Sequence, residues 1–315
     1  MNTHLIASRS APPSCQGGAL PRSGDRIAVV HGTLASSSDP EGYARVHRRG
    51  PSVVAIGKFD GIHRGHRALL SRVLLEARQH HLQAGVVTFD VHPHEALCGA
   101  QHQYLTTAEE RRRLFADAGM DFMLLLRATP ELFAIEAEDF AIALVQALGC
   151  RVIVVGAGFR FGRGAAGDVG ILQRMGASMG VQVIAVDLHS KLGGAVSSSR
   201  IREELRAGRV ERAAELLGRP FALDGVVKLG IGPRWQVEVS SRAALPAPGV
   251  YMGRMDLSGA AAMASRAATI VVSACEAGST QVRHLDVVPL CNAAAFALHG
   301  AIVRVVFDGP ECEMG

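Results

Sequence analysis

The sequence has few aromatic residues, no cysteine pair at metal-ligand spacing and no long hydrophobic run. Aromatic residues make up 5% of the chain, with a single Trp, so Leu, Val, Ile and Ala must fill the core. The six Cys residues are scattered, which argues against a zinc site and a disulfide framework. No apolar run approaches the roughly 18 residues of a membrane span, and the N-terminus lacks a secretory signal pattern. We therefore expect a cytoplasmic protein without a membrane segment.

The charge is nearly balanced, with a formal net charge of +4 from 33 Lys and Arg and 29 Asp and Glu. Residues 222–315 hold 7 basic and 8 acidic residues, which leaves 26 basic and 21 acidic residues in 1–221. This excess suits a small phosphate-bearing ligand, although an ordinary solvated surface has the same balance. No basic run with interleaved aromatics appears, so nucleic acid is not an expected partner.

A length of 315 residues suggests two domains, at roughly 150 residues each. Between residues 51 and 190, short apolar runs alternate with helical patterns. The runs are typical of strands buried on both faces, and they fall at 53–56, 86–89, 122–126, 152–155 and 181–186. This alternation predicts an α/β fold with a doubly wound parallel sheet. Sheets of this kind bind ligands beyond the carboxyl ends of their strands.

Helices are predicted between these strands. Residues 66–80 carry apolar side chains at helical spacing, and Thr107-x-x-Glu110 indicates a capping box. A third helix is expected over 138–148, ended by Gly149, and residues 197–220 predict a pair of short helices.

Residues 222–315 differ in texture, with short β-type runs separated by Gly, Pro and Ser. They predict a small antiparallel, barrel-like β domain, with a helix only around 290–298. We therefore divide the chain into a flexible tail, 1–26, a first domain, 27–221, that includes the helical segment 197–220, and a second domain, 222–315.

The strongest functional signal follows the first buried strand of this region and reads GKFDGIHRGH, from Gly57 to His66. Glycines in such a turn let a phosphate approach the backbone, and the helix start favours an anion. His63 and His66 can donate hydrogen bonds to phosphate oxygens as charge develops. A histidine pair in a surface turn is the simpler alternative. A zinc site is disfavoured because no Cys lies near.

A second phosphate-binding signal is VSSSRIR, residues 196–202. Hydroxyls and amides gather there at a helix start, with Arg200 and Arg202 close behind. Taken alone, the segment is explained by an ordinary N-cap. Together with the histidine loop, it predicts a clamp that holds a triphosphate from two sides.

These residues resemble a known family. GKFDGIHRGH is similar to the GxFDGxHxGH signature of the bacterial bifunctional riboflavin kinase/FMN adenylyltransferases, or FAD synthetases, within the HxGH nucleotidyltransferases. Three further segments resemble family motifs in the right order: VVTFDVHPHE, 86–95; VVGAGFRFGRGAAGD, 154–168; and VSSSRIREELRAGRVERAAELLGRPF, 196–221. The resemblance implies a Rossmann-like nucleotidyltransferase domain followed by a β-barrel.

The resemblance also implies roles for individual residues. The expected catalytic residues are His63, His66 and Arg202. The expected ATP-binding residues are Gly57, Phe59, Asp60, Gly61, Gly65, Ser197, Ser198, Ser199 and Arg200. The expected flavin-binding residues are Phe89, His92, Pro93, Gly156, Gly158, Phe159 and Phe161. Asp60 is expected to shape the turn or face the ribose, and no side chain is expected to bind a metal.

Several positions depart from the family pattern. Gly158 stands where Asp or Asn is usual, Val91 replaces a Pro, and Lys58 replaces an Asn. The spacing of Gly156, Gly158 and Gly162 is GxGxxxG, and no helical period is evident after it, so a dinucleotide fingerprint is disfavoured.

The second domain departs further. The family's kinase domain opens with GRxLGxPTAN, whose Thr and Asn serve the metal and the nucleotide. Residues 228–251 lack the PTAN element, although LPAPGVY, 245–251, and LHGAIVRVVF, 298–307, still resemble family segments. We expect the barrel to be retained and the kinase activity to be lost, because phosphoryl transfer depends on positioned metal and charge.

The leading hypothesis is an FMN adenylyltransferase that uses ATP with Mg²⁺ and converts FMN to FAD. One alternative is a nucleotidyltransferase for another phosphorylated acceptor or a flavin analogue, suggested by Gly158 and Lys58. The other is a silent flavin- or nucleotide-binding regulator, suggested by the eroded second domain. The oligomeric state is left open.

Overall fold

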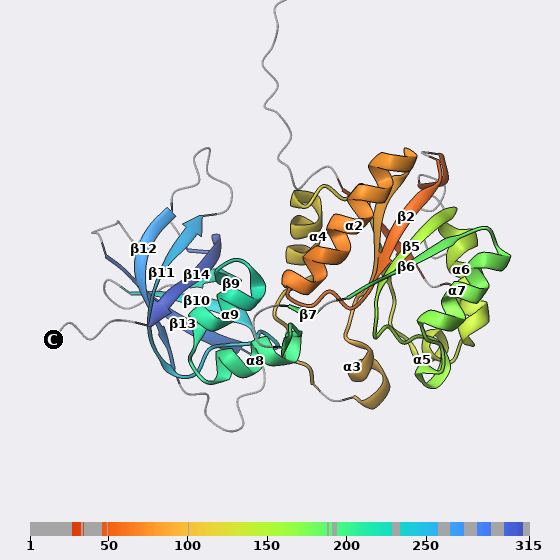
Figure 1. Cartoon of the computed structure of the whole chain (residues 1–315). Coiled ribbons are helices and arrows are strands. Elements are labelled where there is room, and N and C mark those ends of the chain that lie inside the picture. Colours follow the sequence, from red (N-terminus) through yellow and green to blue (C-terminus); the bar gives the residue numbers. More distant parts are fainter. Residues whose placement is uncertain are drawn as a thin grey trace, which may run out of the picture.

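The computed structural model describes residues 27–32, 34, 46–48, 50–99, 101–187, 189–190, 194–228, 234–257, 265–273, 282–290 and 299–310. Its chain forms a parallel sheet flanked by helices, followed by a barrel (Figure 1). The tail expected over 1–26 and nearly all of the helix expected around 290–298 lie outside the described residues.

The sheet has six parallel strands in the order β1-β4-β3-β2-β5-β6. Their bounds are β1 Ala28–Gly32, β2 Ser52–Ile56, β3 Gln83–Phe89, β4 Phe122–Leu126, β5 Cys150–Gly156 and β6 Gln182–Val186. The five predicted runs are therefore confirmed as strands, and the apolar patch before them adds β1 at one edge. β2 and β4 are buried along their whole length, as unbroken apolar runs require.

Helices cover both faces of this sheet (Figure 1). Val53 and Ala55 of β2 belong to a core with side chains of α2, Arg64–His80, and α4, Ala108–Asp117. Val54 and Ile56 belong to a second core with α6, Ala137–Leu148, and α7, Val169–Ser178. Because side chains alternate along a strand, one apolar run serves two cores. The predicted doubly wound α/β architecture is confirmed.

The predicted helix signals hold in detail. The Thr107 hydroxyl accepts a hydrogen bond from the Glu110 amide at 3.1 Å, which begins α4. Gly149 ends α6 in the left-handed conformation, at φ 58°. Two short helices, α3 Pro93–Cys98 and α5 Pro130–Phe133, follow β3 and β4.

One sequence expectation about helices was wrong. A helix does follow the GAGFRFG segment, since α7 begins at Val169 behind an Asp168 cap that accepts from the Ile171 amide at 2.9 Å. A turn that includes the 3-10 helix Arg163–Ala165 separates the glycines from α7. The apolar period of α7 therefore begins too late to be evident directly after the glycines.

The second part is a closed antiparallel barrel, as the sequence suggested. Its strands are β9 Phe221–Lys228, β10 Trp235–Ser240, β11 Gly249–Leu257, β12 Ser265–Val272, β13 Val282–Pro289 and β14 Ile302–Pro310, closed in the order β10-β13-β12-β11-β14-β9. Inward side chains such as Trp235, Leu285 and Val305 are buried. The alternating burial pattern along β9 and β10 is that of strands with one inward face.

The helical pair, α8 Ser198–Arg206 and α9 Val210–Leu217, shares its apolar core with the barrel. Ile201 and Leu205 of α8 and Leu216 of α9 belong to the same cluster as Trp235. A two-stranded ribbon, β7 His189–Ser190 with β8 Gly194–Ala195, precedes α8. The division at residue 221 remains a prediction, and by packing the helical pair lies on the barrel side of it.

Charged side chains join the two parts. Arg304 of β14 donates to Glu110 of α4 at 2.7 Å and to Asp224 of β9 at 3.2 Å. Arg113 of α4 also pairs with Asp224, and Glu110 is only 2% exposed. Burial has the largest influence on the pKa of Glu110 and raises it, while the charge of Arg304 opposes that rise.

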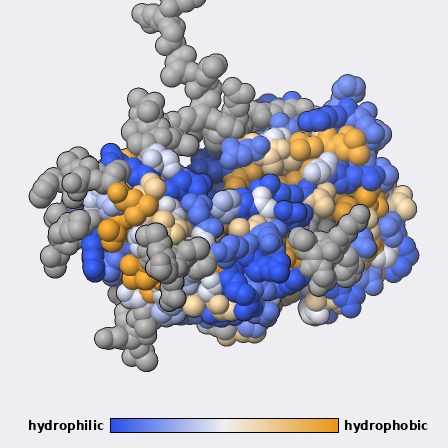
Figure 2. All heavy atoms as spheres, turned by 60° about the vertical axis from the view of Figure 1, so that its left-hand side comes forward, coloured by the Kyte–Doolittle hydropathy of each residue, from blue (hydrophilic) through white to orange (hydrophobic). Residues whose placement is uncertain are grey.

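Apolar residues lie in separate patches on the face shown in Figure 2. The exposed large apolar side chains belong to different elements and are Leu75, Leu97, Ile142, Val250, Leu290 and Ile302. Within the described ranges, no helix is both long and apolar enough to cross a membrane.

Replacing Arg304 by Met should destabilise the protein, because Glu110 would stay buried without its partner. We expect urea unfolding to show a loss of about 3 kcal/mol. The matched control is Arg254→Met, whose pairs with Asp256 and Asp308 lie at the barrel surface and are worth about 1 kcal/mol or less. Equal losses of unfolding free energy in the two variants would show that the Arg304–Glu110 pair stabilises the protein no more than a surface pair does.

Candidate functional site

The predicted loops lie at the point in the sheet where the strand order reverses. β2 pairs with β3 on one side and with β5 on the other. The chain leaves β2 through Gly57 and leaves β5 through Gly156, so both loops begin at carboxyl ends that flank this point. In open α/β sheets ligands bind in the crevice at such a switch point.

The loop after β2 has an uncommon backbone. Phe59, Gly61 and Ile62 have φ values of 52°, 84° and 38°. A side chain at Gly61 would meet Leu105 Cδ1 at 2.8 Å, so glycine is required there for space as well as conformation. The Phe59 ring is fully buried, edge-on to Phe115 at 5.3 Å. Phe59 therefore anchors the loop with its side chain, and only its backbone can face a ligand.

The two histidines lie ring on ring at the start of α2. His63 is the N-cap, and its Nδ1 accepts a hydrogen bond from the His66 amide at 3.3 Å. The ring centroids are 3.7 Å apart with an angle of 15° between the planes. The predicted pair is thus brought together by one helical turn.

Burial keeps both imidazoles neutral. Desolvation lowers the pKa of His63 to about 4, against a smaller opposing influence of Asp60. Desolvation also lowers the pKa of His66 well below its usual value, and the neighbouring His63 and Lys58 lower it further. Because Nδ1 of His63 accepts a hydrogen bond, its proton lies on Nε2, which can donate to a ligand. Nδ1 of His66 is buried and has no hydrogen-bond partner within the described structure.

Asp60 ties the loop to two distant segments. Its Oδ1 accepts from the amides of Leu105 at 2.9 Å and Thr106 at 3.2 Å. Its Oδ2 accepts from Arg202 Nη1 at 2.7 Å, and its backbone carbonyl accepts from Ser198 Oγ at 2.7 Å. The side chain is 6% exposed, so this carboxylate shapes the site from inside.

The serine segment therefore meets the histidine loop through Asp60. Ser197 caps α8 by accepting from the Arg200 amide at 3.3 Å. Ser199 and Ser197 are exposed, and the helix start carries no acidic side chain in its first turn. Arg202 is 9% exposed, and its guanidinium donates hydrogen bonds to Asp60 and to Ser199 Oγ, the latter at 3.4 Å. Arg202 thus joins α8 to the histidine loop in this structure, and its catalytic role stays a prediction.

The segment after β3 approaches Asp60 from the other side. His92 caps α3, and its ring stacks on His102 at 3.9 Å and 12°. Nε2 of His102 lies 3.7 Å from Asp60 Oδ2. Burial and the nearby His102 lower the pKa of His92 to about 4. No sequence motif marked His102, because only its stack on His92 in the folded chain reveals it.

The other flavin candidates lie after β5 and at the end of β3. Phe159 and Phe161 stack at 5.5 Å, but Phe161 is 7% exposed and packs on Phe140. Phe161 is therefore mainly a core residue. Among the described residues, no atom lies within 4 Å of a Cβ built at Gly158, the position that lacks the family's Asp or Asn. Phe89 lies 5.9 Å from Phe133.

Arg111 is a supporting residue that the sequence analysis missed. Its guanidinium is buried and donates to the Lys58 carbonyl at 3.2 Å and to Thr88 Oγ1 at 3.1 Å. The capping box predicted its helix, but no pattern marked this side chain.

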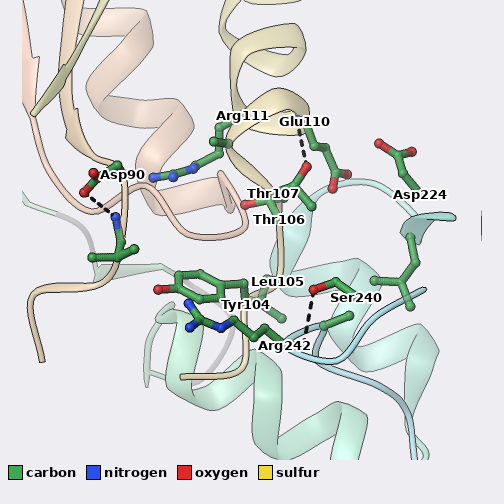
Figure 3. Close-up of a pocket in the computed structure, with 14 residues that line it drawn as sticks. Asp90, Tyr104, Leu105, Thr106, Thr107, Glu110, Arg111, Asp224, Ser240 and Arg242 are labelled. Carbon is green, nitrogen blue, oxygen red and sulfur yellow. Dashed lines mark hydrogen bonds between the residues drawn. The ribbon is translucent and has the colours of Figure 1, made fainter. Parts of the chain in front are cut away.

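Arg111 also lines a pocket of about 130 Å³ between the sheet and the barrel (Figure 3). None of the predicted site residues is among its lining residues, which include Tyr104, Asp224 and Arg242. The chemistry-bearing side chains gather instead at the histidine loop. We therefore take the histidine loop as the candidate site on chemical grounds.

The buried neutral His63 predicts a pH-dependent stability. An unfolded His63 takes up a proton below about pH 6.5, whereas the folded imidazole does so only near pH 4. The free energy of unfolding should therefore fall as pH drops through this window, by up to about 3 kcal/mol from His63.

Urea unfolding of the wild type and of His63→Gln, at steps from pH 7 to pH 4, measures this contribution. The variant should lose part of the slope. His299→Gln is the control, because His299 is exposed and lies before β14 in the barrel. Identical slopes in the wild type and His63→Gln would contradict the prediction.

Comparisons with known proteins agree with this geometry. A family model described as FAD synthetase matches residues 46–200. The bifunctional riboflavin kinase/FMN adenylyltransferase of Escherichia coli is 36% identical over 180 residues, which cover 56% of this chain and 58% of that enzyme. The enzyme of the same name from Listeria monocytogenes is 31% identical over 216 residues, or 66% and 68% of the two chains.

A solved structure shares the fold along most of the chain. It is described as a macrolide-efflux protein from Streptococcus pneumoniae, with a TM-score of 0.77 at 24% identity, covering 90% of this chain and 91% of that one. The alignment with the E. coli enzyme spans less than three fifths of that enzyme's length. The family match, the Listeria relative and the histidine loop agree, and the chain belongs to the family of bifunctional riboflavin kinase/FMN adenylyltransferases, the FAD synthetases.

Proposed function

We propose that this protein is an FMN adenylyltransferase that transfers AMP from ATP to FMN and releases FAD and pyrophosphate. The observation that carries the proposal is the stacked, neutral pair His63 and His66 at the switch point, tied through Asp60 to the start of α8. Two helix starts thus converge on one crevice, an arrangement that suits the phosphates of a nucleotide.

In the proposed reaction, a phosphate oxygen of FMN attacks the α-phosphorus of ATP in line. A new P–O bond forms to FMN, and the bond from the α-phosphorus to the bridging oxygen breaks, so pyrophosphate leaves. No enzyme nucleophile is needed, and catalysis rests on positioning and charge stabilisation. The Nε2–H of His63 and the imidazole of His66 would donate to the transferring phosphate. A phosphate's negative charge would raise the pKa of both groups and strengthen these bonds.

The start of α8 would hold the β- and γ-phosphates. The amides of Ser198 and Ser199 and the side chain of Arg200 are the proposed ligands, with Ser197 as the cap that fixes them. The backbone of Gly57, Phe59, Gly61 and Gly65 would line the nucleotide side. Asp60 and Arg202 would hold these two elements together rather than touch the phosphates.

Mg²⁺ would enter as the ATP complex. Mg²⁺ usually keeps several waters and binds substrate phosphates, so phosphate oxygens and water would supply most of its ligands. Its chemistry would be to neutralise triphosphate charge.

The flavin is proposed to lie between the loops after β3 and β5. His92, Pro93 and Phe89 would contact it from one side, and Gly156, Gly158 and Phe159 from the other. Phe161 would support Phe159 from the core. We place the reaction in the cytoplasm, in keeping with scattered cysteines.

We further propose that riboflavin kinase activity is lost. The segment that would carry PTAN is absent from residues 228–251, and the barrel interior is filled by side chains such as Trp235, Val237 and Phe307. The barrel would then serve as a scaffold.

Gly158 favours a second candidate, adenylyl or cytidylyl transfer to another phosphorylated acceptor. Glycine at this position lacks the polar side chain that is usual in the family, so one polar contact is lost. The described residues also leave room beside Gly158 for a different ring or substituent.

The first test is product analysis. Purified protein with Mg-ATP should convert FMN to FAD and pyrophosphate, and should leave riboflavin unchanged, as followed by chromatography. Parallel reactions with CTP, flavin analogues and other phosphorylated acceptors test the second candidate. FMN formed from riboflavin would contradict the loss of kinase activity. ATP binding measured by calorimetry without any turnover would favour a regulator instead.

The second test removes one donor from the transferring phosphate. His66→Ala should lower kcat by roughly 10²–10³-fold, as for the loss of one positioned donor. His80→Ala, on the same helix but exposed, should keep the wild-type kcat. Steady-state FAD formation measures both. A His66→Ala enzyme with unchanged kcat would falsify the role given to that side chain.

A further inference from the structure

Arg219 reaches the histidine loop from the barrel side of the molecule. It follows Gly218, which ends α9 at φ 72°, and it precedes β9. Its Nη1 donates to the carbonyl of Ile62 at 3.3 Å, across 157 positions of sequence. The two segments are in close contact, because a Cβ at Gly218 would lie 3.1 Å from Arg64 Cγ.

The bond goes to an uncommon residue. Ile62 is β-branched yet has φ 38°, in the left-handed region that such side chains rarely adopt. Its side chain is 2% exposed and packs in the core with Phe59 and Leu69, and its amide donates to the Phe59 carbonyl at 3.3 Å. A conformation of this kind persists only where its surroundings hold it. The Ile62 carbonyl belongs to the peptide that joins Ile62 to His63, so its direction fixes where His63 begins α2.

The positive charge of Arg219 also acts on the His63 imidazole. The charged and titratable groups around His63 are Asp60 in the same loop, Arg219 after α9, and the stacked His66 of α2. Asp60 favours the imidazolium, whereas Arg219 disfavours it. Arg219 is itself partly buried, and desolvation lowers its pKa to about 10, while the charge of Glu110 opposes that fall.

We infer that Arg219 is a positioning residue for adenylyl transfer: it holds the left-handed Ile62 peptide and thereby sets the orientation and the charge environment of His63. It does not touch substrate. This inference rests on the proposed function, and it gives the barrel side of the chain a part in the reaction of the sheet domain that does not require kinase chemistry.

Two variants separate position from charge. Arg219→Met removes both, so kcat for FAD formation should fall by roughly 10–100-fold, the effect of a small misplacement. KM for ATP and FMN should change by less than about threefold, since the substrates lose no contact. Arg219→Lys keeps the charge but loses the reach of the guanidinium, so kcat should still fall about fivefold or more.

The titration of His63, followed by NMR of its imidazole, gives a readout that a merely structural role would not move. Arg219→Met should raise the pKa of His63 by about half a unit to one unit, because a nearby positive charge is lost. Arg219→Lys should leave that pKa close to the wild-type value. Arg212→Met is the matched control, since Arg212 lies on α9 and pairs with Glu215 at the surface.

A double-mutant cycle tests the backbone part. Glycine adopts positive φ readily, so Arg219→Met should cost less kcat when Ile62 is replaced by Gly. Wild-type kcat and an unshifted His63 titration in folded Arg219→Met would overturn the inference. If that variant does not fold, wild-type kcat in Arg219→Lys would overturn it. A wild type that forms no FAD would refute the proposed function alone, because the NMR titration would still test the link between Arg219 and His63.

Discussion

The buried carboxylate of Asp60 is the interaction on which the rest of the site depends. A charged side chain that is 6% exposed is costly unless hydrogen bonds and an opposite charge satisfy it. Asp60 meets that cost with amides 45 and 46 positions away and with the guanidinium of Arg202, 142 positions away. Satisfying one carboxylate therefore closes three segments of chain around the histidine loop.

The charged and titratable groups around this carboxylate are mostly buried. Two cationic side chains beside the loop, Arg111 and Arg202, are buried in internal hydrogen bonds, and their pKa values are lowered by desolvation. The histidines are neutral for the same reason. Such a site is preorganised: its donors point inward at fixed positions, and they gain strength when an anion replaces the missing solvent.

The barrel is more than an appendage to the sheet. It shares its core with α8 and α9, whose serine segment forms one side of the site. The Glu110–Arg304 pair fixes α4, and the segment before α4 supplies the amides that hold Asp60. Loss of the kinase motif would thus leave the barrel under a structural constraint, which is a physical reason for a silent module to keep its fold.

The sequence by itself determined the architecture and the chemistry of the loop. Unbroken apolar runs dictated buried parallel strands, Thr107 and Gly149 set helix ends, and the glycines and histidines after β2 indicated a candidate phosphate site. These signals are local, because strand burial, caps and turns depend on neighbours in sequence. Tertiary structure alone decided that Arg202 neutralises Asp60, that Phe59 and Phe161 are core residues, that His92 stacks on His102, and that Arg219 reaches Ile62. Each of these facts depends on which residues, far apart in sequence, lie next to each other in the fold. A local residue pattern does not encode such contacts.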